Sequence, residues 1–331
     1  MKAAYIESIG GPDTIRFGDL PEPNVRPGEV LVRVKAAAVN PIDTYIRSGM
    51  VSMPLPRPYI VGCDLAGTVE AVNGTSGRFK VGDRVWGSNQ GLLGRQGTFA
   101  ELAAVHEHWL YPTPPAITDE QAAAVALTGI TAHLGLFRCA ALKPGERVYA
   151  SGGTGGVGSM VVQMAKAAGA KVATTVGSAA KAERARRLGA DCVINYRTDD
   201  LKARLVDFAG ETGINVWYET QREQDFQMIL PLMAKRGRIV VMAGRQAQPV
   251  LPIGQFYPKD LSLHGFAMFN ATPQEQSACA EDINRWLSAG KLAVLIGETF
   301  ALRDTVAAQK LQEDNTLHHA GSLIGKIVVT P

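Results

Sequence analysis

A glycine-rich segment near the middle of the chain constrains the fold more than any other feature. Residues 151–158 read SGGTGGVG, in which glycines 153, 155 and 158 have the G-x-G-x-x-G spacing. A short apolar run precedes the segment, apolar residues at helical spacing follow it as far as Gly169, and a strand-like run covers 171–176. This order predicts a strand, a glycine turn, a helix and a second strand, a unit that holds phosphate at a helix N-terminus. The alternative is a glycine-rich turn that binds no ligand.

The residues after the second strand indicate which dinucleotide such a unit would hold. Units that bind NAD usually place Asp or Glu there, and its carboxylate accepts hydrogen bonds from the ribose hydroxyls. This chain has GSAAK at 177–181 instead. A carboxylate would repel a 2′-phosphate, whereas the Ser178 hydroxyl and the Lys181 ammonium can both donate to it, so the sequence predicts NADPH as the cofactor. Ser178 can also cap the next helix, since capping leaves its hydroxyl proton available.

The rest of the chain divides according to its pattern of short apolar runs. At 331 residues it is long enough for two domains. Residues 1–124 hold short strand-like runs separated by prolines, which is typical of an antiparallel β domain. From 125 to 270 apolar runs alternate with helical ones, which predicts a parallel, doubly wound sheet of the α/β class. Two helical runs and a closing strand at 326–329 follow.

Composition argues against several classes of function. Lys and Arg number 34 and Asp and Glu number 31, so a net charge of +3 gives no reason to expect binding to nucleic acid or to a membrane surface. The apolar runs are too short or too charged for a membrane span and the first residues lack a signal-peptide core, so we expect a cytoplasmic protein. The four cysteines lie far apart and form no C-x-x-C pair, so we predict neither a disulfide framework nor a metal site.

Short segments through nearly the whole chain match, in order, those of one family. They are AVNPIDTYIRSG at 38–49, GCDLAG at 62–67, VGDRV at 81–85, LTGITA at 127–132, the glycine segment, LGAD at 188–191, INYR at 194–197 and GKIV at 325–328. The chain thus resembles the zinc-independent branch of the medium-chain dehydrogenase/reductase superfamily, and within it the zeta-crystallin-like NADPH:quinone oxidoreductases. The resemblance implies a GroES-like β domain of residues 1–124 with 296–331 and an inserted Rossmann domain of residues 125–295.

The resemblance also bears on metal-dependent chemistry. Zinc-dependent relatives have a cysteine where Asn40 stands and a histidine where Cys63 stands, and the structural-zinc cysteines are missing between Gly87 and Phe99. A catalytic zinc needs such thiolate and imidazole ligands, so we do not expect alcohol oxidation at zinc. The resemblance implies hydride transfer from NADPH to a quinone or another α,β-unsaturated carbonyl, with a neutral donor stabilising the oxyanion that develops.

The resemblance also implies the residues of the site. It places Asn40 and Tyr45 at the nicotinamide as candidate catalytic donors. Alternatively, Asn40 with Pro41 and Asp43 behind it is a helix N-terminus, and Tyr45 is an ordinary core aromatic. The expected cofactor contacts are Thr128, Thr154, Gly155, Gly156, Val157, Ser178, Lys181, Tyr196, Met242, Gly244 and Phe266.

One turn departs from the family. Quinone reductases usually end the fourth Rossmann strand with an aspartate and a small, glycine-containing turn, whereas this chain has VWYETQRE at 216–223. Ligands bind outside the carboxyl ends of strands in an open α/β sheet, so we expect Glu219, Gln221 and Arg222 near the nicotinamide. The hypothesis is that this turn reshapes the acceptor pocket, together with Arg245 and the run 266–269. Alternatively, the turn is a solvent-exposed loop.

The resemblance leaves alternatives for the function. An enoyl or acryloyl thioester reductase would share the glycine segment and the Ser/Lys pair. A protein that binds NADPH without turnover, in a structural or regulatory role, is the alternative from another class. Relatives commonly dimerise through the edge of the Rossmann sheet, and the apolar run 261–266 is the expected edge strand, so we expect a homodimer with a small-molecule substrate.

Overall fold

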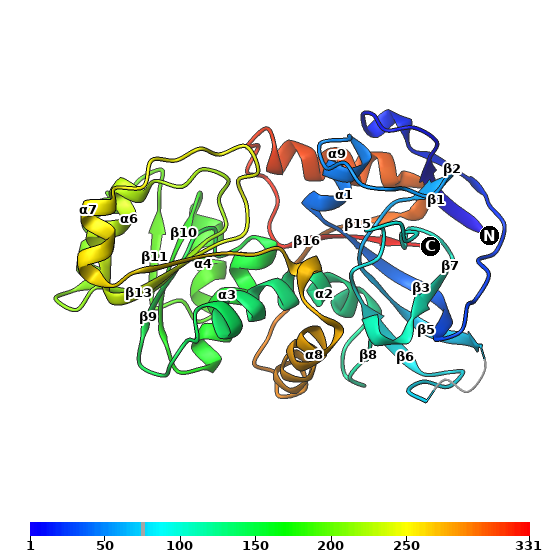
Figure 1. The fold of residues 1–331 in the computed structure, drawn as a ribbon, viewed down its shortest axis with the longest axis horizontal. Helices are drawn as coiled ribbons and strands as arrows, with labels where there is room; N and C mark the ends of the chain where they lie inside the picture. Colours follow the sequence, from blue (N-terminus) through cyan, green and yellow to red (C-terminus); the bar gives the residue numbers. More distant parts are fainter. Residues whose placement is uncertain (74–76) are drawn as a thin grey trace. The chain divides into compact units, whose positions relative to one another are not determined.

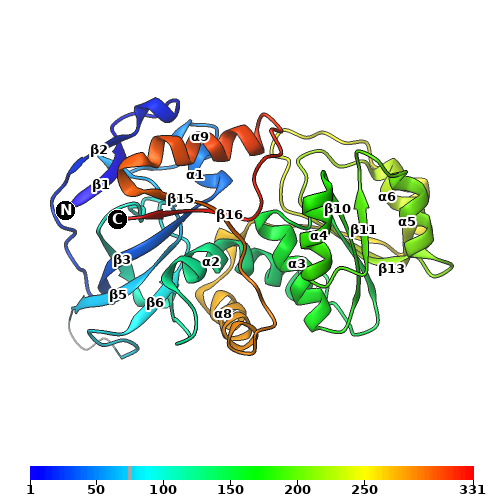
Figure 2. The same cartoon turned by 180° about the vertical axis from the view of Figure 1, so that it is seen from behind.

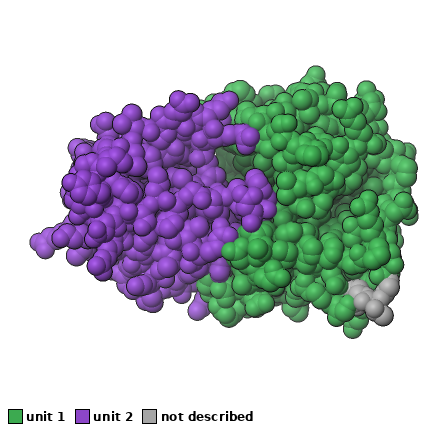
Figure 3. Space-filling view, viewed as in Figure 1, with its two compact units in different colours: residues 1–127, 271–288, 294–331 green, residues 128–270, 289–293 purple. Residues whose placement is uncertain are grey.

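The computed structural model describes residues 1–73 and 77–331, which form two compact units. Unit 1 consists of Met1–Leu127, Ala271–Ser288 and Val294–Pro331, and unit 2 of Thr128–Asn270 and Ala289–Ala293. Figure 3 gives each unit its own colour. The family resemblance implied that 271–288 belongs to the Rossmann domain, but by its contacts this segment belongs to unit 1.

Unit 1 is built on two β-sheets (Figures 1 and 2). One has the strand order β15–β16–β3–β5–β6–β8, with β7 beside β3, and the other has the order β2–β1–β4. Apart from the parallel pair β15–β16, these strands pair antiparallel, as the proline-separated runs predicted. The strands are β1 (Lys2–Ile6), β2 (Arg16–Asp19), β3 (Glu29–Val39), β4 (Tyr59–Ile60), β5 (Leu65–Val72), β6 (Arg84–Gly87), β7 (Leu102–His106), β8 (Leu110–Pro112), β15 (Ile296–Ala301) and β16 (Lys326–Thr330).

The last strand of the chain completes the larger sheet. β16 pairs antiparallel with β3, and Ile327 lies opposite Val39. Because the two strands run in opposite directions, the residue before Ile327 lies beside the residue after Val39. This register brings Lys326 next to Asn40, which begins helix α1 (Pro41–Arg47).

The helices of unit 1 pack on these sheets. Besides α1 they are α8 (Pro273–Ser288), α9 (Thr305–Thr316) and most of α2 (Asp119–His133), with short 3₁₀ turns at η1 (Pro12–Thr14), η2 (Glu107–Trp109) and η6 (Leu302–Asp304). Asn284 attaches α8 to this unit, because it accepts a hydrogen bond from Trp86 Nε1 at 3.0 Å and donates to the Pro112 carbonyl at 2.9 Å. The buried Arg47 ties α1 to α9 through Gln309 and an ion pair with Glu313.

Unit 2 is a parallel sheet with helices around it (Figures 1 and 2). Its strand order, β11–β10–β9–β12–β13–β14, is the order 3-2-1-4-5-6 of a Rossmann fold. The strands are β9 (Arg147–Ala150), β10 (Lys171–Val176), β11 (Cys192–Asn195), β12 (Ile214–Glu219), β13 (Met233–Val241) and β14 (Ser262–Gly265). The helices are α3 (Gly156–Ala167), α4 (Ala179–Arg187), α5 (Leu201–Ala209), α6 (Phe226–Leu232) and α7 (Ile253–Phe256), with the π-helix η3 (Leu134–Cys139) and the short 3₁₀ turns η4 (Tyr257–Lys259) and η5 (Met268–Asn270).

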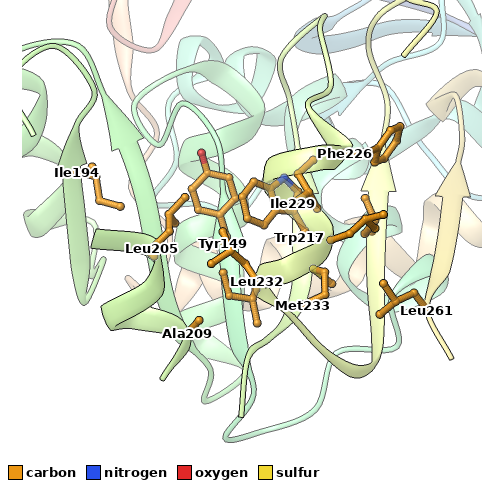
Figure 4. Packing of buried hydrophobic residues seen from close by; sticks show 14 residues of the cluster. Tyr149, Ile194, Leu205, Ala209, Trp217, Phe226, Ile229, Leu232, Met233 and Leu261 are labelled. Atoms are coloured by element: carbon orange, nitrogen blue, oxygen red, sulfur yellow. The ribbon is translucent and has the colours of Figure 1, made fainter. Parts of the chain in front are cut away.

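The two faces of this sheet have separate cores. Figure 4 shows one of them, in which side chains of α5 and α6 pack on Tyr149 and Trp217 from β9 and β12. The rings of Tyr149 and Trp217 lie 4.0 Å apart between centroids and are tilted by 37°. The opposite face carries Val176 and Val193 under α4. Burial of such large aromatic and aliphatic side chains stabilises a fold by about 1.5–3 kcal/mol each, so this packing fixes the strands that carry the glycine segment.

One helical stretch is long and apolar enough to pass a test for a membrane span, although the sequence analysis found none. It covers Asp119–Cys139, where α2 continues into η3, and 78% of its apolar window is buried inside the protein. Core helices of soluble proteins pass the same test. The small residues of this stretch, chiefly alanine and glycine, suit close packing in a protein interior.

Candidate functional site

The glycine segment connects β9 to α3, as its sequence predicted. Two of its glycines are required by close contacts. A Cβ atom on Gly158 would lie 2.2 Å from the Gly152 carbonyl oxygen, and a Cβ on Gly153 would lie 2.2 Å from Thr174 Oγ1. Gly152 itself has a φ of +63°. The segment therefore folds back tightly on the first turn of α3.

The N-terminus of α3 differs from those of the next three helices. α4, α5 and α6 are each capped by a side chain, namely Ser178, Asp200 and Asp225. α3 has Gly155 at the N-cap and no side-chain cap. The first N–H groups of a helix have no partner within the helix, and they carry the positive end of its dipole. This helix end is therefore suited to bind an anion such as a pyrophosphate.

Basic and aromatic side chains gather after β10 and β11. Ser178 Oγ accepts a hydrogen bond from the Lys181 backbone N–H at 3.3 Å, so capping leaves its hydroxyl proton available. Burial and the positive charge of Arg197 lower the pKa of Lys181. Tyr196 is 53% exposed, and its hydroxyl oxygen would lie 2.4 Å from a Cβ on Gly177. Lys181 and Arg197 supply two cations here, and 177–181 contains no acid, so this end of the sheet suits a 2′-phosphate.

Most of the predicted cofactor contacts lie at one edge of the parallel sheet. Thr154, Gly155, Gly156 and Val157 follow β9, Ser178 and Lys181 follow β10, Tyr196 follows β11, Met242 and Gly244 follow β13, and Phe266 follows β14. All of them therefore stand beyond the carboxyl ends of strands, where open α/β sheets bind ligands. Thr128 is the exception, since it is buried within α2.

The Glu219 side chain faces the interior of unit 2, so within the expected turn it is Gln221 and Arg222 that stay available to an acceptor pocket. Glu219 ends β12 but is only 6% exposed, and its carboxylate points into unit 2. Ser151 Oγ donates to Glu219 Oε1 at 2.5 Å, and Trp217 Nε1 donates to Oε2 at 3.1 Å. The carboxyl-end rule locates a backbone and not a side chain, and here these two donors hold the side chain inside.

The rest of the turn packs on the loop after β13. Gln224 donates to the Ala243 carbonyl at 3.3 Å, and a Cβ on Gly244 would lie 2.5 Å from the Arg222 carbonyl oxygen. Gln221 is exposed and Arg222 is half-buried. These two side chains, unlike Glu219, remain at the surface of the carboxyl edge.

A second polar group, which we call the Asn40 cluster, lies inside unit 1. It consists of Asn40, Asp43, Cys63, Asp64 and Lys326, each at most 5% exposed. Asn40 Nδ2 donates to Asp64 Oδ2 at 2.8 Å and to the Ala38 carbonyl at 3.2 Å, and Asn40 Oδ1 accepts from Lys326 Nζ at 2.6 Å. The Asn40 backbone N–H donates to Asp43 Oδ2 at 2.7 Å, as in the helix N-terminus that the sequence offered as an alternative.

Burial governs the protonation of this cluster. It raises the pKa of Asp43 to about 7, opposed by the Cys63 thiol and the Asn40 N–H, and that of Asp64 to about 6, opposed chiefly by Lys326. Burial also lowers the pKa of Lys326, opposed by the two aspartates, and raises that of the Cys63 thiol. Two buried carboxylates thus share one ammonium, and the raised pKa of Asp43 brings its titration close to neutral pH.

These contacts bear on both candidate catalytic residues. Asn40 is 0% exposed, and both of its amide hydrogens already have acceptors within unit 1. Tyr45 lies on α1 and is half-buried. Among residues 1–73 and 77–331, no three or more His, Cys, Asp and Glu side chains are grouped to hold a metal ion. Sequence reasoning missed the roles of Asp64 and Lys326, although a lysine opening the apolar strand 326–330 was a visible signal.

Comparisons with known proteins give a consistent family. The chain matches the alcohol dehydrogenase GroES-like domain over residues 26–115 and the zinc-binding dehydrogenase family over residues 156–285. The quinone oxidoreductase of Homo sapiens is 31% identical over 330 residues, 99% of this chain and 97% of that protein. The quinone oxidoreductase of Pseudomonas aeruginosa is 32% identical over 315 residues, 93% of this chain and 94% of that protein.

Solved structures agree over the full length. An Escherichia coli quinone oxidoreductase complexed with NADPH has a TM-score of 0.86 at 28% identity, covering 100% of both chains. An NAD-dependent alcohol dehydrogenase has a TM-score of 0.90 at 30% identity, covering 100% of both chains, and a 2-haloacrylate reductase 0.84 at 28%, covering 100% of this chain and 99% of that one. The chain therefore belongs to the quinone oxidoreductase family of the medium-chain dehydrogenase/reductase superfamily, a family of NADPH-dependent oxidoreductases.

Proposed function

We propose that this protein reduces a quinone or another α,β-unsaturated carbonyl with NADPH, without a metal. The uncapped N-terminus of α3, beside the basic residues after β10 and β11, is the observation that supports the cofactor. The names of the relatives, which include quinone oxidoreductases and a 2-haloacrylate reductase, support an acceptor with an activated double bond.

The residues of unit 2 divide the binding of NADPH among them. The N–H groups at the start of α3, from Gly155 to Val157, would hold the pyrophosphate. Ser178 and Lys181 would donate to the 2′-phosphate, and Tyr196 would cover the adenine. Thr128, Thr154, Met242, Gly244 and Phe266 would complete the contacts. When bound, NADPH supplies the hydride.

The family resemblance is the ground for the proposed donor to the acceptor. Tyr45 would donate its hydroxyl proton to the oxyanion that develops on the acceptor. Asn40 would position α1, since its amide is already hydrogen-bonded to Asp64 and Lys326. The donor set supports a metal-independent reaction, because the Cys63 thiol is buried, its pKa is raised, and the Lys326 ammonium lies in the same cluster.

Turnover with a panel of acceptors tests the reaction. We expect oxidation of NADPH, followed by its absorbance, with quinones or enones. Faster turnover with enoyl or acryloyl thioesters would favour the thioester reductase alternative. Tight NADPH binding without oxidation by any of these acceptors would favour the non-catalytic alternative and contradict the proposal.

A charge reversal tests the cofactor separately. Lys181→Glu should raise the Kd for NADPH about tenfold or more and leave the Kd for NADH nearly unchanged, because only NADPH has the 2′-phosphate. Lys202→Glu makes the same charge change at an exposed position of α5 and serves as the control. Equal losses for both cofactors would contradict the assignment of Lys181.

The edge of the Rossmann sheet supports a homodimer. β14 is the last strand of its sheet, and Leu263 on it is 39% exposed. Such an edge is normally paired or covered. Leu263→Lys should convert a dimer to a monomer in light scattering, and a wild-type chain that is monomeric at every concentration would contradict this part of the proposal.

A further inference from the structure

The carboxylate of Glu219, at the end of β12, accepts three hydrogen bonds. Oε1 accepts from Ser151 Oγ at 2.5 Å and from the Gln221 backbone N–H at 2.8 Å, and Oε2 accepts from Trp217 Nε1 at 3.1 Å. Both oxygens face donors, so the site is matched to a charged carboxylate. A glutamine there would turn its NH₂ group toward a donor, whichever way the amide was oriented.

The hydroxyl, the carbonyl and the backbone N–H of Ser151, the first residue of the glycine segment, all form hydrogen bonds. Its Oγ donates to Glu219 and accepts from the Thr220 backbone N–H at 2.7 Å. Its carbonyl accepts from Thr220 Oγ1 at 3.0 Å, and its N–H donates to the Tyr218 carbonyl at 3.2 Å. The end of β12 therefore determines where the segment begins.

The next residues of the segment are fixed from the other side by β10. Gly152 and Gly153 donate from their backbone N–H groups to Thr175 Oγ1 and to the Thr175 carbonyl, at 3.2 and 3.1 Å. The Gly152 carbonyl lies against Gly158 in the first turn of α3, where an added Cβ would be only 2.2 Å from it. The start of the segment is thus held between β12 and β10, and loss of the contacts from β12 would leave the helix end that carries the anion-binding N–H groups held from one side only.

We propose that Glu219 is a positioning residue for NADPH, which sets the glycine segment and the N-terminus of α3 through Ser151. The inference rests on the binding of NADPH and does not depend on which acceptor is reduced. Trp217 contributes to the same positioning, since its indole N–H donates to the second carboxylate oxygen of Glu219.

Calorimetric titration of the full-length protein with NADPH tests the positioning role. Glu219→Gln should raise the Kd about tenfold, the loss expected when one charge-assisted hydrogen bond to a fixed loop is broken. In steady state the KM for NADPH should rise more than kcat falls, and the order of preference among acceptors should not change. Glu223→Gln, which removes an exposed acid from the same turn, is the matched control and should leave the Kd within about twofold.

A double variant tests the hydrogen-bond logic itself. In Glu219→Gln we expect the amide oxygen to keep the two donors at the Oε1 position, so that the NH₂ group faces Trp217 Nε1–H. Trp217→Phe in the same chain should then recover part of the lost affinity, although Trp217→Phe alone should weaken binding. The indole emission offers a readout independent of turnover. Glu219→Gln should change the emission of the unliganded protein, and this change should vanish in the Trp217→Phe background.

Several results would overturn the proposal. An unchanged Kd for NADPH with a lowered Tm would leave Glu219 a purely structural role. A changed acceptor preference with an unchanged Kd would restore the pocket hypothesis. If Glu219→Gln does not fold, Glu219→Asp, which keeps the charge on a shorter side chain, must still raise the Kd. Absence of turnover in the wild type would contradict the proposed reaction but would not affect these comparisons of NADPH affinity.

Discussion

Buried carboxylates occur in both units, and their surroundings differ. Glu219 in unit 2 accepts three hydrogen bonds, two on Oε1 and one on Oε2. In the Asn40 cluster of unit 1, Asp43 and Asp64 each have an oxygen, Oδ1, with no hydrogen-bond partner of good geometry. Asn40 links the two aspartates to the one ammonium of Lys326. The first site matches its anion with donors, and the second compensates two acids with a single cation.

The difference shows how a buried acid is used. Donors on both oxygens hold a carboxylate in one orientation, which suits Glu219 to fix a loop. Where the donors do not offset desolvation, burial raises the pKa, to about 7 for Asp43 and to about 6 for Asp64. The Asn40 cluster should therefore respond to loss of its cation and to pH, whereas the Glu219 site should respond to loss of a donor.

Removal of the Lys326 ammonium from the Asn40 cluster should have the largest effect on stability. Lys326→Met should lower the free energy of unfolding by about 3–5 kcal/mol, because it leaves buried carboxylates without a counter-charge. Urea denaturation at pH 7 measures this. Adding Asp64→Asn to Lys326→Met should recover part of the loss, since the double variant has lost one charge of each sign. A loss under about 1 kcal/mol for Lys326→Met would mean that the aspartates do not depend on this lysine.

Removal of a hydrogen-bond donor from the Glu219 site should lower the free energy of unfolding by less. Ser151→Ala takes one donor from Glu219 Oε1 and the acceptor from the Thr220 N–H, so we expect a loss of about 1–3 kcal/mol and weaker NADPH binding. Thermal unfolding and titration with NADPH measure the two effects. Ser52→Ala, at an exposed position, is the control. A stability loss without any change in NADPH affinity would separate the Glu219 site from cofactor binding.

Local patterns predicted most of unit 2. The glycine segment, the alternation of strands and helices and the residues 177–181 all act within about thirty positions, which is the range that sequence periodicity can resolve. The expected strand run at 171–176 corresponds to β10, and the alternation expected from 125 to 270 corresponds to the strands β9 to β14 and the helices between them. The position of Glu219 could not be predicted in the same way. The available signal was Trp217 two residues before it, on the same face of a strand.

The Asn40 cluster required information that local patterns do not contain. Lys326 and Asn40 are separated by 286 positions, and only the pairing of β16 with β3 brings them together. The family resemblance supplied the segments 38–49, 62–67 and 325–328 without indicating that their charges meet. The assignment of 271–288 to the Rossmann domain failed for the same reason, because the partners of Asn284 lie more than 170 positions away.

The smallest expected effect is a pH dependence confined to the Asn40 cluster. The pKa of Asp43 rises from the usual 3.8 to about 7 on folding, so between these values the folded protein binds more protons than the unfolded chain. The contribution of this proton binding by Asp43 to the free energy of unfolding is fully present below pH 4 and is lost as the pH rises through 7. Asp43→Asn removes this titration and keeps an acceptor oxygen for the Asn40 N–H.

The variant should therefore gain stability over the wild type as the pH rises, by about 1 kcal/mol between pH 6 and pH 8. Because the prediction concerns this difference, the titrations of Asp64 and Lys326 cancel to the extent that they are independent of Asp43. Urea denaturation at a series of pH values measures this difference in the free energy of unfolding between the variant and the wild type. For Asp207→Asn, at an exposed position on α5, the same difference should not change with pH. A difference that stays constant or shrinks with pH would show that Asp43 is ionised throughout this range, and the contrast drawn between the Asn40 cluster and the Glu219 site would then fail.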